Sequence, residues 1–245
     1  KPDLALRLLR PTMRRGLLSS DDTLCRDQRR IVAASFAPGA VDALVPVFVR
    51  AADEKMAGWG EVEDMAAQAT ATTMRVISDA LFAGDPRLTS AAAMAHIAAA
   101  LDGVSESRLQ VLLGLPLIPL SRKGLAAHRG QHYLRRTLAA IVEDRLPDGR
   151  GDDFLARMIR ALLDRFSPDE ATALAVDNAA TFYLAGHETT ANALSWTLFL
   201  LAEQPALQDS AAEEARAAIT ARPDQPDLPD PLPLLGPIVE ESMAL

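Results

Sequence analysis

The stretch SPDEATALAVDNAATFYLAGHETTANALSWTLFLLAEQ, residues 167–204, decides the fold. It opens with a complete helix-start signal, because Ser167 can cap the first turn, Pro168 suits the first helical position and two acidic residues follow. No proline interrupts the pattern until Pro205. We therefore predict one helix over residues 168–204, about 50 Å long at 1.5 Å per residue, which is enough to cross a whole domain.

The rest of the chain also reads as helices separated by turns. Of the 245 residues, 49% are hydrophobic and 4% aromatic, alanine is abundant, and runs of β-branched residues are scarce. We therefore predict a mainly α fold with no strand. Further helices are expected over residues 23–35, 41–57, 61–82, 88–113, 122–145, 152–166 and 206–221, and from Ile238 onward.

Proline and glycine set the predicted boundaries. Pro11 and Gly16 are expected to interrupt the start of the chain, and the proline-rich residues 223–237 are expected to form a loop. Residue 1 is not methionine, and residues 240–245 lie within a helical pattern. We therefore expect one domain over residues 1–245 that is cut at both ends.

Composition excludes several classes of function. A net charge of −8 and a pI near 5.0 argue against a nucleic-acid partner, which requires clustered Lys and Arg. The single cysteine, Cys25, cannot form an internal disulfide, and no paired Cys/His spacing typical of structural zinc is present. No secretory signal and no stretch long enough to be a transmembrane segment appear, so we predict a cytoplasmic location.

The long helix combines burial with polar groups. At about 100° per residue, Asn178, Phe182, Ala185 and Thr189 share one stripe, and we expect them to line one concave surface. Apolar residues also occupy the opposite side, which indicates a buried helix.

Residues 185–190, with the sequence AGHETT, place Gly186 and two threonines, which are poor helix formers, at the centre of that helix, and this suggests a functional site. The Thr189 hydroxyl can bond the carbonyl of Ala185, and Gly186 leaves space where the helix could bend around a bound group. One alternative is a polar notch in a helical bundle. A zinc-protease motif is excluded, because the second histidine of His-Glu-x-x-His is replaced by Ala191.

The segment FYLAGHETT, residues 182–190, resembles the oxygen-binding helix of the cytochromes P450, whose pattern Ala/Gly-Gly-x-Asp/Glu-Thr-Thr/Ser it matches at every position. Residues 191–205, ending in LLAEQP, are similar to the continuation into the next helix of the family. Gly16-Leu17-Leu18 followed by residues 29–36, RRIVAASF, resembles the helix that approaches the haem propionates. The resemblance implies a partial cytochrome P450 fold, from the propionate-binding helix to the start of the Glu-x-x-Arg helix.

The resemblance implies haem as the cofactor and assigns roles to six residues. Thr189 and Glu188 are the expected catalytic residues, since Thr189 assists oxygen activation and Glu188 helps relay protons. The expected haem-binding residues are Arg29, Phe182, Ala185, Gly186 and Thr189. Of these, Arg29 would bind a propionate as a guanidinium forked onto a carboxylate. Phe182 and Ala185 are also expected to contact substrate.

Two positions depart from the family pattern. Cys25 stands where a Trp or His normally precedes the propionate arginine, and it is not expected to be the iron ligand. Near the end, Glu241 matches the acid of the Glu-x-x-Arg helix, but Ala244 stands at the arginine position. A buried carboxylate without its partner would cost several kcal/mol or take up a proton. The axial cysteine of the family would lie beyond Leu245, so no residue in the sequence is assigned as a metal ligand.

The resemblance implies a haem-dependent monooxygenase that uses dioxygen to oxidise an apolar small-molecule substrate. Electrons would come from an external redox partner, because no flavin or nicotinamide fingerprint appears. The 245 residues alone are expected to be inactive. The alternative is a decayed or truncated helical scaffold without catalysis, favoured by Cys25 and Ala244. A reading frame continuing into Phe-x-x-Gly-x-x-x-Cys would favour the enzyme, and a stop codon would favour the scaffold.

Overall fold

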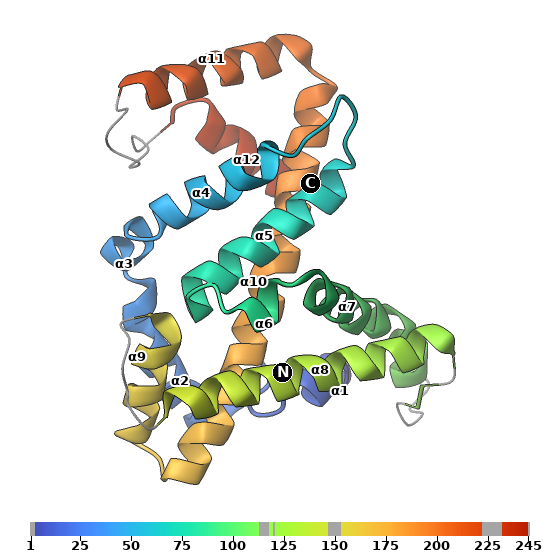
Figure 1. Cartoon of the computed structure of the whole chain (residues 1–245), viewed down its shortest axis with the longest axis vertical. Helices are drawn as coiled ribbons and strands as arrows, with labels where there is room; N and C mark the ends of the chain where they lie inside the picture. Colours follow the sequence, from blue (N-terminus) through green and yellow to red (C-terminus); the bar gives the residue numbers. More distant parts are fainter. Residues whose placement is uncertain (1–2, 113–117, 120, 147–152, 222–231, 245) are drawn as a thin grey trace. The chain divides into compact units, whose positions relative to one another are not determined.

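The computed structural model, shown in Figure 1, describes residues 3–112, 118–119, 121–146, 153–221 and 232–244. The described chain is helical and contains no strand, so the predicted mainly α class is confirmed. Its elements are α1 (Asp3–Met13), α2 (Asp22–Ala33), a 3-10 turn η1 (Ala34–Phe36), α3 (Pro38–Asp42), α4 (Val45–Met56), α5 (Met65–Phe82), α6 (Pro86–Thr89), α7 (Ala91–Leu112), α8 (Arg122–Arg145), α9 (Phe154–Leu163), α10 (Pro168–Ala202), α11 (Pro205–Ala221) and α12 (Leu235–Ala244).

The long helix is present as predicted. Helix α10 has 35 residues and begins at Pro168, where the Ser167 hydroxyl accepts a hydrogen bond of 3.4 Å from the amide of Glu170. It ends at Ala202, and Pro205 begins α11. The helix-start signal therefore fixed this boundary.

Several predicted boundaries were wrong. Pro11 does not end the first helix: α1 continues two residues beyond it, to Met13, although proline has no amide hydrogen to bond the preceding turn. Helix α5 begins at Met65 instead of residue 61, after Asp64 accepts a hydrogen bond of 3.1 Å from the amide of Ala67.

The predicted loop over residues 223–237 was also wrong at its end. Helix α12 begins at Leu235, and Pro237 lies in its first turn, where an amide group has no helical partner to lose. The carboxylate of Glu214 accepts hydrogen bonds of 2.9 and 2.8 Å from the amides of Leu234 and Leu235. Residues 222–231 of the predicted loop lie outside the described residues.

The chain divides into two compact units. Unit 1 comprises residues 1–36 and 78–184, and unit 2 comprises residues 37–77 and 185–245. The single domain over residues 1–245 stays a prediction. No helix among the described residues has the length and apolar character needed to cross a membrane.

Unit 1 is built around α8, α9 and the first half of α10. Its fully buried large side chains include Phe82, Leu88, Ile97, Leu134, Leu138, Ile141, Leu155, Leu162, Leu174 and Tyr183. The Tyr183 hydroxyl lies 3.5 Å from the carbonyl oxygen of Leu88. Burial raises the pKa of Tyr183 to about 12, because the charged phenolate would lose its hydration.

Helices α7 and α8 pack closely in unit 1, and a glycine makes this possible. A Cβ atom added to Gly130 would lie 2.1 Å from the carbonyl oxygen of His96 and 2.9 Å from the amide nitrogen of Ala100. Both atoms belong to the backbone of α7, so no side-chain rotation could relieve the overlap. Beside this contact, the ring of His96 stacks on Tyr133 with centroids 4.6 Å apart.

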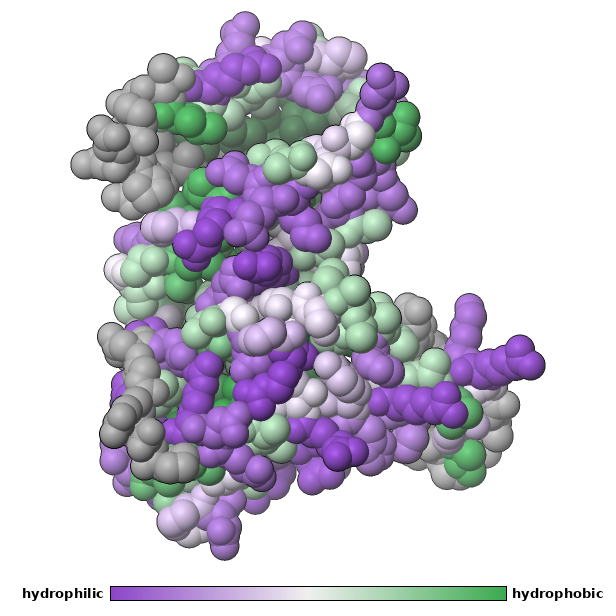
Figure 2. Space-filling view, viewed as in Figure 1, coloured by the Kyte–Doolittle hydropathy of each residue, from purple (hydrophilic) through white to green (hydrophobic). Residues whose placement is uncertain are grey.

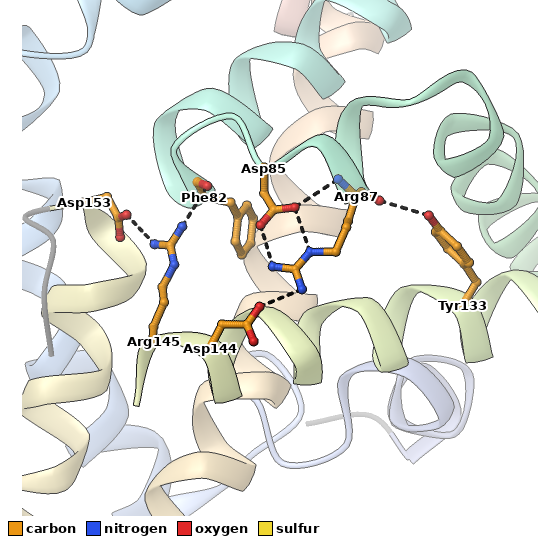
Figure 3. A network of polar contacts seen from close by, with 7 residues as sticks. All are labelled: Phe82, Asp85, Arg87, Tyr133, Asp144, Arg145 and Asp153. Atoms are coloured by element: carbon orange, nitrogen blue, oxygen red, sulfur yellow. Dashed lines mark hydrogen bonds and ion pairs between the residues drawn. The ribbon is translucent and has the colours of Figure 1, made fainter. Parts of the chain in front are cut away.

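A polar network ties the α5–α6 turn to α8 (Figure 3). The Arg87 guanidinium donates hydrogen bonds of 2.8 to 2.9 Å to Asp85, and one of 2.8 Å to Asp144 of α8. The hydrogen bonds from Arg87 hold the pKa of Asp85 below its usual value. Farther along α8, Arg145 pairs with Asp153 and donates a hydrogen bond of 2.9 Å to the carbonyl of Phe82.

Unit 2 has a core of mostly small side chains. Its buried apolar residues include Ala51, Ala69, Met74, Ala191, Leu201, Ala211 and Ala218. Two buried hydroxyl groups, those of Thr197 and Ser242, lie 2.6 Å apart and join α10 to α12. Figure 2 shows hydrophilic residues along the outer surface of α11 and hydrophobic residues in the recess beneath it.

Candidate functional site

The segment 185–190 continues α10 as regular helix within unit 2. The Thr189 hydroxyl donates a hydrogen bond of 2.8 Å to the carbonyl of Ala185, as predicted from the sequence. Thr190 makes the same bond, also 2.8 Å, to the carbonyl of Gly186. Each threonine thus adds a second donor to a carbonyl of the preceding turn, an arrangement that tends to bend helices. Both hydroxyls can exchange this bond for one to a bound molecule, because both residues are exposed.

The glycine of the motif has a packing role that the sequence did not reveal. A Cβ atom on Gly186 would lie 2.6 Å from the Cδ1 atom and 3.3 Å from the Cγ1 atom of Ile77 on α5. The absent side chain therefore lets α5 approach α10 within unit 2. The role of Gly186 beside a bound group stays a prediction.

Helix α10 presents two different faces at the motif. His187 is fully buried, whereas Glu188 and Thr189 are exposed. Ala185 is half-buried. A carboxylate and a hydroxyl, which are both groups that can exchange protons, thus lie close in sequence to a small, half-buried side chain on α10.

Phe182 belongs to an aromatic cluster in unit 1. Its ring centroid lies 5.2 Å from that of Phe154 and 5.7 Å from that of Phe36. Phe154 is buried, whereas 53% of Phe36 is exposed. The cluster is therefore anchored on one side and open on the other, which suits contact with an apolar ligand.

Asn178 does not lie on an open surface, so its expected place on a concave surface was wrong. It is 1% exposed, its amide nitrogen donates a hydrogen bond to Gln28, and its side-chain oxygen accepts one of 2.9 Å from the amide of Leu17. Helical phase placed Asn178 on the stripe correctly, but it could not show that α2 and the turn after α1 cover this part of the stripe.

Arg29 is exposed on α2 of unit 1. Among the described residues, none forms an ion pair with its guanidinium, so the group is open to an external anion. Cys25 lies one turn earlier, is half-buried, and has its sulfur 3.8 Å from the carbonyl oxygen of Leu17. The thiol of Cys25 thus makes a weak hydrogen bond within unit 1. The haem-binding role of Arg29 stays a prediction.

Sequence reasoning missed a buried ion pair in unit 1. Asp177, 4% exposed, receives hydrogen bonds of 2.8 Å from the Arg135 guanidinium and 3.0 Å from the amide of Arg15. Arg135 also donates to the carbonyl of Thr12 at 2.6 Å. The sequence signal for this pair was Asp177, a lone acid in an apolar stretch of the long helix. Its partner Arg135 lies 42 residues away, so the sequence did not reveal it. The pair joins α1, α8 and α10.

A cavity of about 430 Å³ opens between α1 and α2 in unit 1. It is lined by Arg10, Arg14, Arg15, Ser19, Ser20, Asp21 and Leu24. The hydroxyl of Ser19 donates to the carbonyl of Arg14 at 2.6 Å, so its proton faces the backbone instead of the cavity. None of the predicted site residues lines this cavity.

The end of α12 does not bury an acid. Glu241 and Ala244 are both exposed, so the expected cost of a buried, unpartnered carboxylate does not arise. Ser242, between them, is buried and bonded to Thr197. Among the described residues, no group of three or more His, Cys, Asp or Glu side chains is arranged to hold a metal ion.

Comparison with known proteins bears on the fold and on the family of this chain. Among solved structures, a crystal structure of a cytochrome P450 (CYP102L1) has a TM-score of 0.78 at 22% identity, and the match covers 98% of this chain and 58% of that one. This likeness shows the fold. The partial cytochrome P450 fold predicted from the sequence is thus confirmed.

Curated relatives come from several kingdoms. Cytochrome P450 monooxygenase 128 of Postia placenta is 26% identical over 285 residues, covering 100% of this chain and 52% of the relative. Cyclooctatin synthase of Streptomyces melanosporofaciens is 27% identical over 229 residues, covering 90% and 49%. Human cytochrome P450 4F12 is 26% identical over 275 residues, covering 100% and 52%. The chain spans about half the length of these relatives. The family model described as Cytochrome P450 matches residues 3–244, and the chain therefore belongs to the cytochrome P450 family.

Proposed function

We propose that this chain is the helical part of a haem-dependent monooxygenase that inserts one oxygen atom of dioxygen into an apolar organic substrate. The observation that carries the proposal is the exposed Thr189, whose hydroxyl bonds the carbonyl of Ala185 beside the exposed carboxylate of Glu188. Membership of the cytochrome P450 family supports it. Electrons would come from an external redox partner.

The residues proposed to bind haem are of kinds that a haem would need. Arg29 offers an exposed guanidinium without an ion-pair partner among the described residues, suited to a propionate carboxylate. Ala185 is small and half-buried, and the aromatic cluster around Phe182 is open on one side. A bound haem would supply the iron at which dioxygen is reduced. Arg29, Phe182, Ala185, Gly186 and Thr189 are the proposed haem-binding residues, and Phe182 and Ala185 would also contact the substrate.

Thr189 and Glu188 would deliver protons in this reaction. The Thr189 hydroxyl can rotate from the carbonyl of Ala185 toward a ligand, so it can accept one proton and donate another. Glu188 is exposed and can exchange protons with solvent. Together they would carry protons from water to a ligand bound beside Thr189.

The test is Thr189→Ala in a complete, haem-loaded protein. The haem spectrum should stay nearly unchanged, whereas the product formed per electron falls and peroxide rises, because alanine fills the space without carrying a proton. Glu188→Gln should lower the yield less, since water can replace the carboxylate. Thr190→Ala is the matched control, because Thr190 is also exposed and makes the same helical bond. An unchanged yield in Thr189→Ala would remove this residue from the mechanism.

The second candidate is a helical scaffold without catalysis. Two departures from the family pattern favour it: by resemblance, Cys25 stands where a propionate-binding aromatic residue is expected, and the exposed Ala244 stands where the arginine partner of Glu241 is expected. The 245 residues alone are proposed to be inactive, and Cys25 is not proposed to ligate iron. If reduced haem and carbon monoxide added to this chain gave a red-shifted band that Cys25→Ser abolished, the proposal that Cys25 does not ligate iron would be wrong.

A further inference from the structure

Two histidines lie one helical turn apart on the exposed surface of α8 in unit 1. His128 and His132 are both exposed, and their ring centroids are 4.7 Å apart with the ring planes at 70°. Residues four apart on a helix project from the same face. A neutral imidazole carries one nitrogen with a free lone pair, so the pair can present two such nitrogens to one point in solvent.

Two imidazoles at this spacing are a known way for a helix to hold a metal ion. Imidazole binds Zn²⁺, Cu²⁺ and Ni²⁺ well, whereas Mg²⁺ and Ca²⁺ prefer oxygen ligands. We propose that His128 and His132 form a chelating site for a divalent transition-metal ion of the zinc, nickel and copper class. Water would supply the remaining ligands of the ion.

Neighbouring residues on α8 affect how tightly the histidine pair would bind a metal ion. By helical spacing, Gly124 precedes His128 by one turn and presents no side chain there, which leaves room for the ion and its water. Arg129 and Arg136 are exposed neighbours on the same helix, and their positive charges oppose a dication. The site is therefore expected to bind reversibly, with an affinity set by the two nitrogen ligands.

The test is calorimetric titration of Ni²⁺ into the 245-residue chain carrying Cys25→Ser, which removes a competing thiol. One Ni²⁺ should bind per chain, and Mg²⁺ should not bind. His128→Ala and His132→Ala should each weaken Ni²⁺ binding by about tenfold or more, because one of two protein ligands is lost. His96→Ala is the matched control, since His96 is also exposed but has no histidine four residues away, and it should change the affinity by less than about twofold.

A relocated pair distinguishes chelation from a general effect of losing a histidine. Gly124→His in the His132→Ala background creates a new pair with His128, again four residues apart, and should recover Ni²⁺ binding. Circular dichroism would verify that α8 stays helical in every variant. The proposal is overturned if either alanine variant at 128 or 132 binds Ni²⁺ as tightly as the parent, if His96→Ala weakens binding equally, or if the relocated pair fails to restore it in a helical chain.

Discussion

Gly130→Ala is expected to destabilise unit 1 although alanine is the better helix former. In an open helix the change would stabilise by about 1 kcal/mol. Here the new Cβ atom would lie 2.1 Å from the carbonyl oxygen of His96, so the two helices must separate by about 1 Å or more to reach an ordinary contact. Overpacking of this kind costs about 1–3 kcal/mol, and rigid backbone atoms argue for the upper end. The net loss should be about 2 kcal/mol.

Urea unfolding followed by circular dichroism measures this loss. Ala126→Gly is the calibration within the same helix, because Ala126 is exposed on α8, and it should cost about 1 kcal/mol through helix propensity alone. Gly236→Ala should be neutral or stabilising, because among the described residues no atom from outside the local helix backbone lies within 4 Å of the added Cβ. If Gly130→Ala were as stable as the parent while Ala126→Gly lost the expected amount, the close packing of α7 on α8 would be wrong.

Two further predictions concern buried groups of unit 1. In a Tyr133→Phe background, the phenolate absorbance of Tyr183 should appear with a midpoint well above pH 10, because burial, the largest cause that raises its folded pKa to about 12 from 10.0, remains. The contribution of neutral Tyr183 to the free energy of unfolding is therefore fully present below pH 10 and is lost as the pH rises through the folded pKa. A titration midpoint near pH 10 would contradict the burial of Tyr183. Arg135→Met should cost about 3 kcal/mol in urea unfolding, because the Asp177 carboxylate would stay buried without its guanidinium. A loss below about 1 kcal/mol, the range of an exposed pair, would mean that water reaches Asp177.

The sequence predicted those features that depend on neighbours along the chain. The start of α10 at Pro168 followed from a capping signal of four adjacent residues, and the bond from Thr189 to Ala185 followed from a spacing of four. Both are local, because helix geometry alone brings the atoms together. The predicted roles of Thr189, Glu188 and Arg29 rest on resemblance, and they stay predictions.

Features that depend on distant segments could not be predicted. The contact of Ile77 with α10 at Gly186 is one such feature, because Ile77 is 109 positions away in the sequence. Asn178 was placed on the right face of its helix, yet Gln28 covers it from 150 residues away. Hydrophobic periodicity reports which face is buried, but it does not report what buries it.

The division of aromatic residues between the two units gives each an optical signal of its own. Both tryptophans, Trp59 and Trp196, belong to unit 2, where they are 38% and 60% exposed, and both tyrosines belong to unit 1. Indole emission therefore reports the unfolding of unit 2 without any contribution from unit 1. If the emission curve and the tyrosine curve coincide in urea, the chain unfolds as one cooperative domain. If they separate, Phe36–Ala37, Ile77–Ser78 and Leu184–Ala185 mark real boundaries of cooperativity, and α10 must remain folded in one unit while it melts in the other.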